Sequence, residues 1–369
     1  MKNPSVFCIY AGMTRPVGAC EIYRGNMPLY YLEKMLGWDT GWAFVQDIVE
    51  DMRRTDMQSL YQLVSQFDVF VFPRLYVQND NVKQSLAVIY AIIRANGKRI
   101  VYETDDDYTN KHRIVCDGDA ITPALWADAL TVTTPYLAEI MRQHVKRPMY
   151  VLPNCVDPRV WRDNPLPKVE EFDDVVMVGL TGSITHSNDW KILQNVLPRA
   201  LDENPNMQLL IMGYHPDYLK DLPRTHYANG AEYHLYAQMI RQLDVVLCPV
   251  DPQDGFNLGK SDIKAVEGMA GARIVNGNIA GAFPIATDNK VYQLSIKNGE
   301  TGILVDHTET AWYNAIDSVV KDRSFRETVQ NKAYQWAWSK RNIETRCKDW
   351  AKAYRAISRS PVNSITLPL

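Results

Sequence analysis

Short strand-like runs recur along the whole chain, and most are followed by a polar turn and then by a helical pattern. The runs cover residues 6–10, 67–72, 98–103, 129–132 and 149–152 in the first half, and 174–180, 207–213, 244–250 and 272–276 in the second. Strands that alternate with helices in this way form a parallel sheet with helices on both faces. The sequence therefore predicts the α/β fold class.

The alternation is interrupted once, by the polar and proline-containing segment 158–174, which is typical of a linker. A chain of 369 residues is also long enough for two domains. We therefore predict an N-terminal domain over 1–157 and a C-terminal domain over 158–339.

The last helical pattern, over 342–358, carries apolar residues at spacings of three and four, which predicts a helix docked on a core. Its opposite face is basic, with Arg341, Lys348, Lys352 and Arg355. Basic residues interleaved with aromatic ones can mark nucleic-acid binding. Because the aromatic positions follow core spacing, we favour a docked helix with a solvated basic face.

The composition argues against several classes of function. The net charge of −3 gives no overall basic field that would favour nucleic acid. The six cysteines are scattered, without a CxxC pair or a His/Cys cluster, which is typical of reduced thiols rather than of a metal centre. No apolar run approaches the roughly 20 residues that span a bilayer, and the apolar part of the N-terminus is too short for a signal peptide. We expect a cytoplasmic protein without a transmembrane segment.

The segment 254–273 follows one of the apolar runs and combines a glycine-containing loop with a helical pattern. At about 100° per residue, Lys260, Lys264 and Glu267 fall on one face of that helix. A glycine loop that leads into a helix N-terminus is an anion site, because backbone N–H groups and the helix dipole point the same way. Two lysines and a carboxylate that can bind sugar hydroxyls suit a nucleotide-sugar diphosphate. The alternative is a surface helix with ordinary charged residues.

Polar residues also follow the strand-like runs of the N-terminal half. Arg74 follows 67–72, Asp105 and Asp106 follow 98–103, and the Gly12–Gly18 loop follows 6–10. Ligands of open α/β sheets sit beyond the carboxyl ends of strands. We therefore favour a carboxylate that binds or activates an acceptor hydroxyl. An Asp-rich turn that caps the next segment is the alternative; a metal site is less favoured, because three adjacent carboxylates cannot converge on one ion.

The loop after 174–180 adds a second candidate phosphate contact. Gly182 and Ser183 can bring backbone amides and a hydroxyl close to a phosphate. His186 is a candidate contact for a phosphate or for an acceptor, although a single histidine is more often structural.

Five stretches of the chain, taken together and in order, resemble the GT-B glycosyltransferases of the retaining family 4 type, particularly bacterial and phage members with a Lys-Ser motif. The stretches are GACEIYR at 18–24, VYETDDD at 101–107, VLPNCVD at 151–157, GLTGS at 179–183 and FNLGKSDIKAVE at 256–267.

The resemblance implies two Rossmann-like domains that face each other across a cleft, with 340–369 packing back on the N-terminal domain. It implies that Glu267 holds the ribose, that the amides of 258–261 cradle the diphosphate, and that the chemistry needs no metal and no cofactor beyond the nucleotide-sugar donor. The predicted donor-binding residues are Gly182, Ser183, Asn257, Leu258, Gly259, Lys260, Ser261, Lys264 and Glu267. The predicted acceptor-side residues are Gly18, Tyr23, Arg24, Arg74 and His186, and the predicted catalytic residues are Asp105, Asp106 and Lys260.

The chain departs from the family pattern at three places. Gly259 stands where the first of the paired glutamates is expected, Thr181 and Ser183 stand where an Arg/Lys pair is expected, and the Asp105 region replaces a histidine. These departures leave the donor sugar open.

The predicted function is transfer of a hexose or pentose to an acceptor hydroxyl, with retention. The acceptor is a surface polysaccharide or glycoconjugate, or a hydroxymethylated base in phage DNA. The alternative is a non-catalytic nucleotide-sugar or glycan-binding module on the same scaffold. A UDP-sugar phosphorylase or a sugar epimerase is a minor enzymatic alternative.

Overall fold

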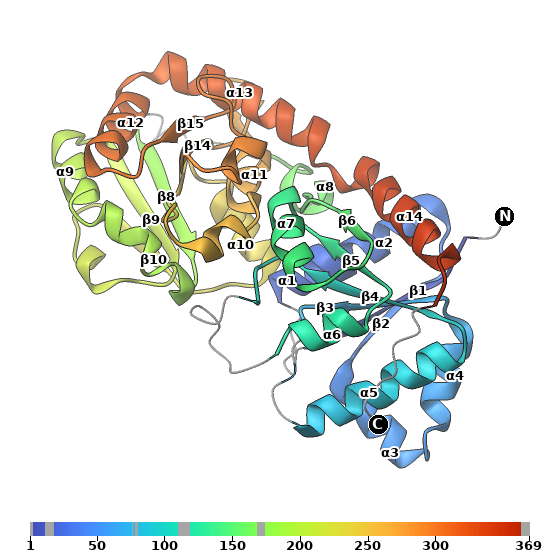
Figure 1. Ribbon diagram of the computed structural model, residues 1–369. Helices are drawn as coiled ribbons and strands as arrows, with labels where there is room; N and C mark the ends of the chain where they lie inside the picture. The colour runs from blue at the N-terminus through green and yellow to red at the C-terminus, as the bar shows by residue number, and fades with distance from the viewer. Residues whose placement is uncertain are drawn as a thin grey trace. The chain divides into compact units, whose positions relative to one another are not determined.

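The computed structural model describes residues 3–11, 18–75, 77, 80–109, 119–167 and 174–362 (Figure 1). Of the predicted Gly12–Gly18 loop, only Gly18 lies within these ranges. The chain forms two compact units: unit 1 contains Met1–Asn154 and Ile343–Leu369, and unit 2 contains Cys155–Asn342. The boundaries predicted from the sequence were 157/158 and 339/340.

Unit 1 is built on a parallel sheet, which has six strands in the described part of the chain, in the order β2-β1-β3-β4-β5-β6. Every residue of β1 and β3 is buried, as expected for parallel strands covered on both faces. The strands are β1 (Val6–Tyr10), β2 (Thr40–Phe44), β3 (Val69–Pro73), β4 (Arg99–Thr104), β5 (Ala129–Val132) and β6 (Met149–Val151).

The helices of unit 1 begin with a π-helical turn, η1 (Ile22–Asn26), between α1 (Ala19–Glu21) and α2 (Met27–Leu36). The helix α14 (Ile343–Arg359) packs against α2 and buries Ile343, Cys347, Trp350, Tyr354 and Ile357. These are the residues that the sequence spacing placed on a packing stripe. The remaining helices are α3 (Val45–Arg54), α4 (Gln58–Gln66), α5 (Asp80–Ala95), α6 (Ile121–Trp126) and α7 (Pro135–His144).

Unit 2 repeats this plan. Its parallel sheet, again six-stranded within the described ranges, has the order β10-β9-β8-β11-β14-β15. The strands are β8 (Val176–Gly182), β9 (Met207–Gly213), β10 (Thr225–Ala228), β11 (Val245–Cys248), β14 (Phe283–Thr287) and β15 (Ile303–Val305). The helices are α8 (Pro158–Trp161), α9 (Val196–Glu203), α10 (Tyr233–Ile240), α11 (Ile263–Ala270), α12 (Glu309–Lys321) and α13 (Arg323–Lys340).

Two sequence predictions are corrected in unit 2. The run 272–276 is not a strand of the main sheet: β12 (Arg273–Val275) pairs antiparallel with β13 (Asn278–Ala280) and lies beside β7 (Leu166–Pro167). Asn276 and Gly277 both have positive φ, at 49° and 75°, which is the geometry of a two-residue hairpin turn. The predicted linker 158–174 contains the helix α8, whose Trp161 is fully buried.

The two ends of unit 2 lie side by side. The N–H of Val156 donates to the carbonyl of Arg341 at 2.8 Å, and Val156 forms a parallel bridge with Asn342. Both residues belong to unit 2, so this bond closes the unit at the two points where the chain enters and leaves it.

The strand order identifies where each sheet can hold a ligand. In unit 2 the order proceeds outward in both directions from the neighbouring pair β8 and β11, and in unit 1 from β1 and β3. Such a pair is a topological switch point, and ligands of open α/β sheets bind beyond the carboxyl ends of its strands.

Candidate functional site

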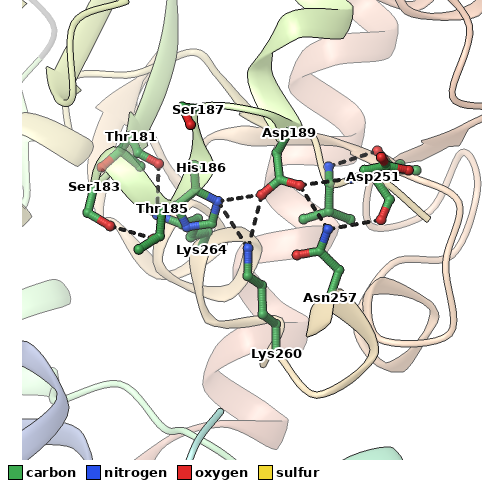
Figure 2. Close-up of polar contacts among 12 residues, drawn as sticks. Thr181, Ser183, Thr185, His186, Ser187, Asp189, Asp251, Asn257, Lys260 and Lys264 are labelled. Carbon is green, nitrogen blue, oxygen red and sulfur yellow. Dashed lines mark hydrogen bonds and ion pairs between the residues drawn. The ribbon is translucent and has the colours of Figure 1, made fainter. Parts of the chain in front are cut away.

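The candidate site of unit 2 lies at the switch point between β8 and β11. The strand β8 ends at Gly182 and is followed by residues 183–189, whereas β11 ends at Cys248 and is followed by residues 249–262. Figure 2 shows that side chains from these two segments converge: His186 and Asp189 from the first, Asn257 and Lys260 from the second.

Glycine is required where the ends of β8 and β9 meet. Gly213 has φ of +91°, and a Cβ at that position would lie 2.4 Å from the carbonyl oxygen of Gly182. A Cβ on Gly182 would lie 2.8 Å from the His186 ring. Gly182 therefore lets the backbone and the imidazole approach each other closely at the end of β8.

Lys260 is held in the centre of the site. Its Nζ lies 3.0 Å from Asp189 Oδ2 and 3.3 Å from His186 Nδ1. The ammonium also lies 5.4 Å from the ring centroid of Phe256. The side chain is 12% exposed, so the charge is largely shielded from solvent but still reachable.

Lys264 reaches the same region from the first turn of α11. Its Nζ donates to the carbonyl oxygen of Thr181 at 2.7 Å, and burial lowers the pKa of its ammonium. The sequence had placed Lys260 on this helix as well. Instead, Gly255–Leu258 forms a separate 3-10 turn capped by Asp254, and α11 begins only at Ile263, so Lys260 lies in the loop between them.

Asp189 is fully buried beneath the two segments and accepts hydrogen bonds from both. Its Oδ1 accepts from the Asn257 side-chain amide at 2.8 Å and from the Asp251 N–H at 3.0 Å. Its Oδ2 contacts His186 Nδ1 at 3.0 Å and Lys260. Burial raises the pKa of Asp189, but the contacts with His186 and Lys260 outweigh burial and hold the pKa well below its usual range.

His186 is neutral at physiological pH. Burial, together with the nearby charges of Lys264 and Lys260, lowers its pKa to about 3, although Asp189 opposes this shift. The ring stacks on Trp190 with an interplanar angle of 18°. The sequence predicts an acceptor-side role for His186, whereas the structure places it in unit 2 among the predicted donor-binding residues.

Glu267 lies in the second turn of α11 and is 4% exposed. Its Oε2 accepts a hydrogen bond from the Tyr236 hydroxyl of α10 at 2.8 Å. Burial, with Glu267 beside it, raises the pKa of Tyr236 well above its usual value, so this hydroxyl stays a donor. The contact fixes the Glu267 carboxylate at the inner end of the site.

The other predicted donor-binding residues lie on or beside the same loops. Asn257 is buried, and its Oδ1 has no hydrogen-bond partner among the described residues. Leu258 is exposed, Gly259 is buried and Ser261 is half-buried. Ser183 is exposed and its hydroxyl lies 2.7 Å from that of Thr185.

In unit 1 the structure brings Arg74, Asp105 and Asp106 together. Arg74 Nε lies 3.4 Å from Asp105 Oδ1, and Arg74 Nη2 lies 3.7 Å from Asp106 Oδ2. The guanidinium also lies 5.0 Å from the ring centroid of Tyr108. Arg74 adopts φ of +50°, and its N–H donates to the Glu103 carbonyl at 2.8 Å, so the backbone directs this side chain to the end of β4.

Arg24 is not exposed with this group. It is fully buried on η1, where its Nε pairs with Glu103 Oε1 at 2.7 Å and its Nη1 donates to Leu152 O at 2.7 Å and to Asn154 Oδ1 at 2.9 Å. Burial raises the pKa of Glu103 to about 7, although Arg24 and Thr131 oppose the shift. Arg24 therefore connects η1 to β4 and to the segment after β6 in the interior of unit 1.

The two remaining acceptor-side predictions lie near Arg24 in sequence but differ in exposure. Gly18 is exposed just before α1, whereas Tyr23 is 4% exposed.

The described ranges contain no group of three or more His, Cys, Asp or Glu residues that could hold a metal ion. None of the helices described is long and apolar enough to cross a membrane.

No protein-family model matches the sequence, and no curated protein matches it. Solved structures do match. HepE from Anabaena, in complex with UDP and glucose, is 13% identical with a TM-score of 0.66, over 95% of this chain and 100% of that chain. Sucrose-phosphate synthase from Thermosynechococcus elongatus is 14% identical with a TM-score of 0.67, over 95% and 98%.

A glycosyltransferase from Rickettsia africae is 13% identical with a TM-score of 0.64, over 97% of this chain and 100% of that chain. At these identities the similarity concerns the fold. The chain has the fold predicted from its sequence, two α/β units on parallel sheets, as in GT-B glycosyltransferases.

Proposed function

We propose that the protein is a glycosyltransferase of the retaining type, which moves a sugar from a nucleoside-diphosphate sugar to an acceptor hydroxyl. The observation that carries the proposal is the pair of lysines at the unit 2 switch point, with Glu267 on the same helix as Lys264. The position of the pair is where an open α/β sheet binds ligands. The structural neighbour HepE was crystallised with UDP and glucose.

The residues suit the charge that develops in such a transfer. When the bond between the sugar C1 and the diphosphate oxygen breaks, the departing diphosphate gains negative charge, and preorganised cations and amides stabilise it. We assign this role to Lys260, Lys264 and the backbone amides of 258–261. Glu267 binds the ribose hydroxyls, and the Asn257 Oδ1 can accept from a sugar hydroxyl.

We assign the acceptor to unit 1, with Asp105 and Asp106 as the carboxylates that bind its hydroxyl and Arg74 as the residue that orients them. We further propose that the transfer needs no metal and no cofactor beyond the donor, because Lys260 and Lys264 supply the positive charge that a metal would bring to the diphosphate.

We propose a glycan rather than modified DNA as the acceptor. The DNA proposal relied on four basic residues along the last helix. Arg341 is buried and pairs with Asp262 at 2.6 Å, and Arg355 donates to Asn3 and lies over the Trp38 ring. Lys348 and Lys352 remain exposed, which is a small footprint for binding a phosphate backbone.

A donor screen followed by mass spectrometry tests the proposed function. The purified protein is incubated with UDP-, GDP-, ADP- and dTDP-sugars, alone and with glycans or hydroxymethylated DNA. The proposal expects release of the nucleoside diphosphate from at least one donor and a mass increase of one sugar on an acceptor. Binding of a donor with no turnover on any acceptor would favour the binding module, and release of free epimerised sugar would favour an epimerase.

Glu267→Gln is expected to weaken UDP binding by about 10- to 100-fold, since a charge-assisted hydrogen bond contributes about 1.5–3 kcal/mol. Glutamine keeps an acceptor for Tyr236, so the loss reports the missing charge rather than an unsatisfied hydroxyl. Calorimetry with UDP measures the effect. Glu203→Gln, at an exposed glutamate on α9, is the control, and equal affinities for all three proteins would exclude a ribose contact.

Asp105→Asn is expected to lower turnover by about 100-fold, as for loss of a general acid or base, while UDP affinity changes little. Steady-state kinetics with the donor found in the screen measures this. Asp107→Asn is the matched control, because Asp107 is a neighbouring buried carboxylate that accepts from Thr109. If both variants behave alike, the acidic turn is only a structural cap.

A further inference from the structure

Asp189 lies in the candidate site, and the sequence alone predicts no role for it. Its carboxylate accepts from the Lys260 ammonium, from a side-chain amide and from a backbone N–H, it contacts the His186 imidazole, and it is 0% exposed. A carboxylate with this number of donors is held in one orientation. Asp189 therefore fixes the side chains of Lys260 and His186 relative to the sheet.

These contacts join the two segments of the switch point. Asp189 follows β8, whereas Asp251, Asn257 and Lys260 all follow β11 (Figure 2). The Lys260 side chain has many rotamers in solution, and holding it costs conformational entropy. The buried Asp189 carboxylate holds the Lys260 ammonium in position before a ligand binds.

Asp189 also selects the tautomer of His186. An unprotonated Nδ1 would set its lone pair against the Asp189 Oδ2 lone pair at 3.0 Å, so Nδ1 carries the proton and Nε2 carries none. Lys260 can turn its N–H bonds toward Asp189 and away from Nδ1. In this tautomer the imidazole cannot donate to a phosphate oxygen from Nε2, which can only accept.

We propose that Asp189 is a positioning residue: its carboxylate fixes the Lys260 ammonium and the Nδ1–H tautomer of His186, so that Lys260 meets the charge developing on the departing diphosphate. The inference rests on the proposed glycosyltransferase function and adds to it the residue that prepares Lys260.

Because Asp189 is negatively charged, removing its carboxylate should affect UDP affinity and turnover differently. A released Lys260 attracts the diphosphate less in the ground state, but the carboxylate lies close to the place assigned to the diphosphate and repels it, so removal of the carboxylate offsets this loss. Its removal does release Lys260 from the position in which it meets transition-state charge. Loss of positioning therefore lowers turnover and leaves UDP affinity in place.

The test compares wild type, Asp189→Asn, Lys260→Met and the double variant. Asp189→Asn is expected to lower donor turnover by about 100-fold and to leave the UDP dissociation constant the same or lower. In the Lys260→Met background the same substitution is expected to cost less than about 3-fold in turnover, because the two residues act as one unit. Equal costs in both backgrounds, or parallel losses of turnover and UDP affinity, would overturn the proposal.

Asp244→Asn is the matched structural control. Asp244 is a buried aspartate of the same unit that pairs with Arg273, but it precedes β11 at the opposite end of the sheet. We expect Asp244→Asn to lower thermal stability. It should not show the selective loss of turnover, with UDP affinity kept, that is expected for Asp189→Asn. If Asp189→Asn fails to fold, Asp189→Glu keeps the charge but displaces the ammonium, and its loss of turnover is compared in the wild-type and Lys260→Met backgrounds in the same way.

A second measurement does not depend on turnover. The ¹⁵N shifts of the His186 ring, assigned by their loss in His186→Gln, are expected to show a protonated Nδ1 in wild type and a changed tautomer balance in Asp189→Asn. An unprotonated Nδ1 in wild type, or identical spectra for the two proteins, would refute the role of Asp189. If wild type binds no nucleoside diphosphate, the proposed function fails, and the spectra still decide the positioning of His186.

Discussion

Replacing Lys260 with methionine is expected to lower donor turnover by about 100- to 1,000-fold, the usual cost of removing one preorganised group from developing transition-state charge. Methionine retains most of the aliphatic stem and removes the ammonium, together with its contact to the Phe256 ring. UDP affinity should fall as well, because the ammonium contacts the diphosphate in the ground state and in the product. Stopped-assay kinetics and calorimetry measure the two losses separately.

Lys191→Met is the control for this substitution. Lys191 is exposed, and it lies two residues after Asp189 in the same segment. The control should retain wild-type turnover and UDP affinity. Full activity of the Lys260 variant would remove the main support for the donor site. It would favour the alternative that 254–273 is a surface segment with ordinary charged residues.

Arg24→Met is expected to lower the free energy of unfolding by about 3–5 kcal/mol, because it leaves Glu103 as a buried carboxylate without its cation. The substitution also removes the donors to Leu152 O and Asn154. Urea unfolding of the purified variants measures the loss. Arg199→Met is the control, because Arg199 pairs with Glu203 on the surface, where solvent screens the pair and its loss should change stability little.

The cost of the Arg24 substitution should depend on pH. The pKa of Glu103 is raised to about 7 in the folded protein, and loss of Arg24 raises it further. The folded protein then keeps a proton that the unfolded chain releases above about pH 4.3, so stability falls as pH rises toward the folded pKa. In wild type the fall levels off above pH 7, whereas in Arg24→Met it continues.

The gap between wild type and Arg24→Met should therefore be smaller at pH 5.5 than at pH 8.5. A gap that is independent of pH would mean that Glu103 stays neutral in both proteins, and that the cost comes from the lost hydrogen bonds alone.

The sequence predicted the parts of the fold whose patterns are local. Buried central strands such as β3 and β8 are continuous apolar runs, and the stripe from Ile343 to Ile357 repeats at helical spacing, so both are visible without a structure. The edge strands β2, β10 and β15 are short and partly exposed, and they lack that signal. The hairpin of β12 and β13 could have been found from Asn276-Gly277, the turn that such hairpins favour.

The sequence could predict that candidate-site residues lie near one another only where they belong to the same segment of the chain. Lys264 and Glu267 lie four and seven residues after Lys260, and the structure places all three at the same end of the sheet, although only two are on the helix. Asp189 could not be assigned a role, because its partners other than His186 lie 62 to 71 residues away along the chain and meet it only through the strand order. Arg24 was misleading for the opposite reason: a charged residue in a glycine-containing segment looked exposed, but Glu103 allows it to be buried.

The bond between Val156 and Arg341 has a consequence for how this chain can change over time. Unit 2 is one uninterrupted stretch whose ends are adjacent, while unit 1 is assembled from two stretches. The gene segment for unit 2 therefore lies as one continuous insertion, or cassette, between the two segments that encode unit 1, the host. Recombination at two short joints would exchange the whole cassette, including Lys260, Asp189 and Glu267, and leave every strand pairing of the host sheet as it was.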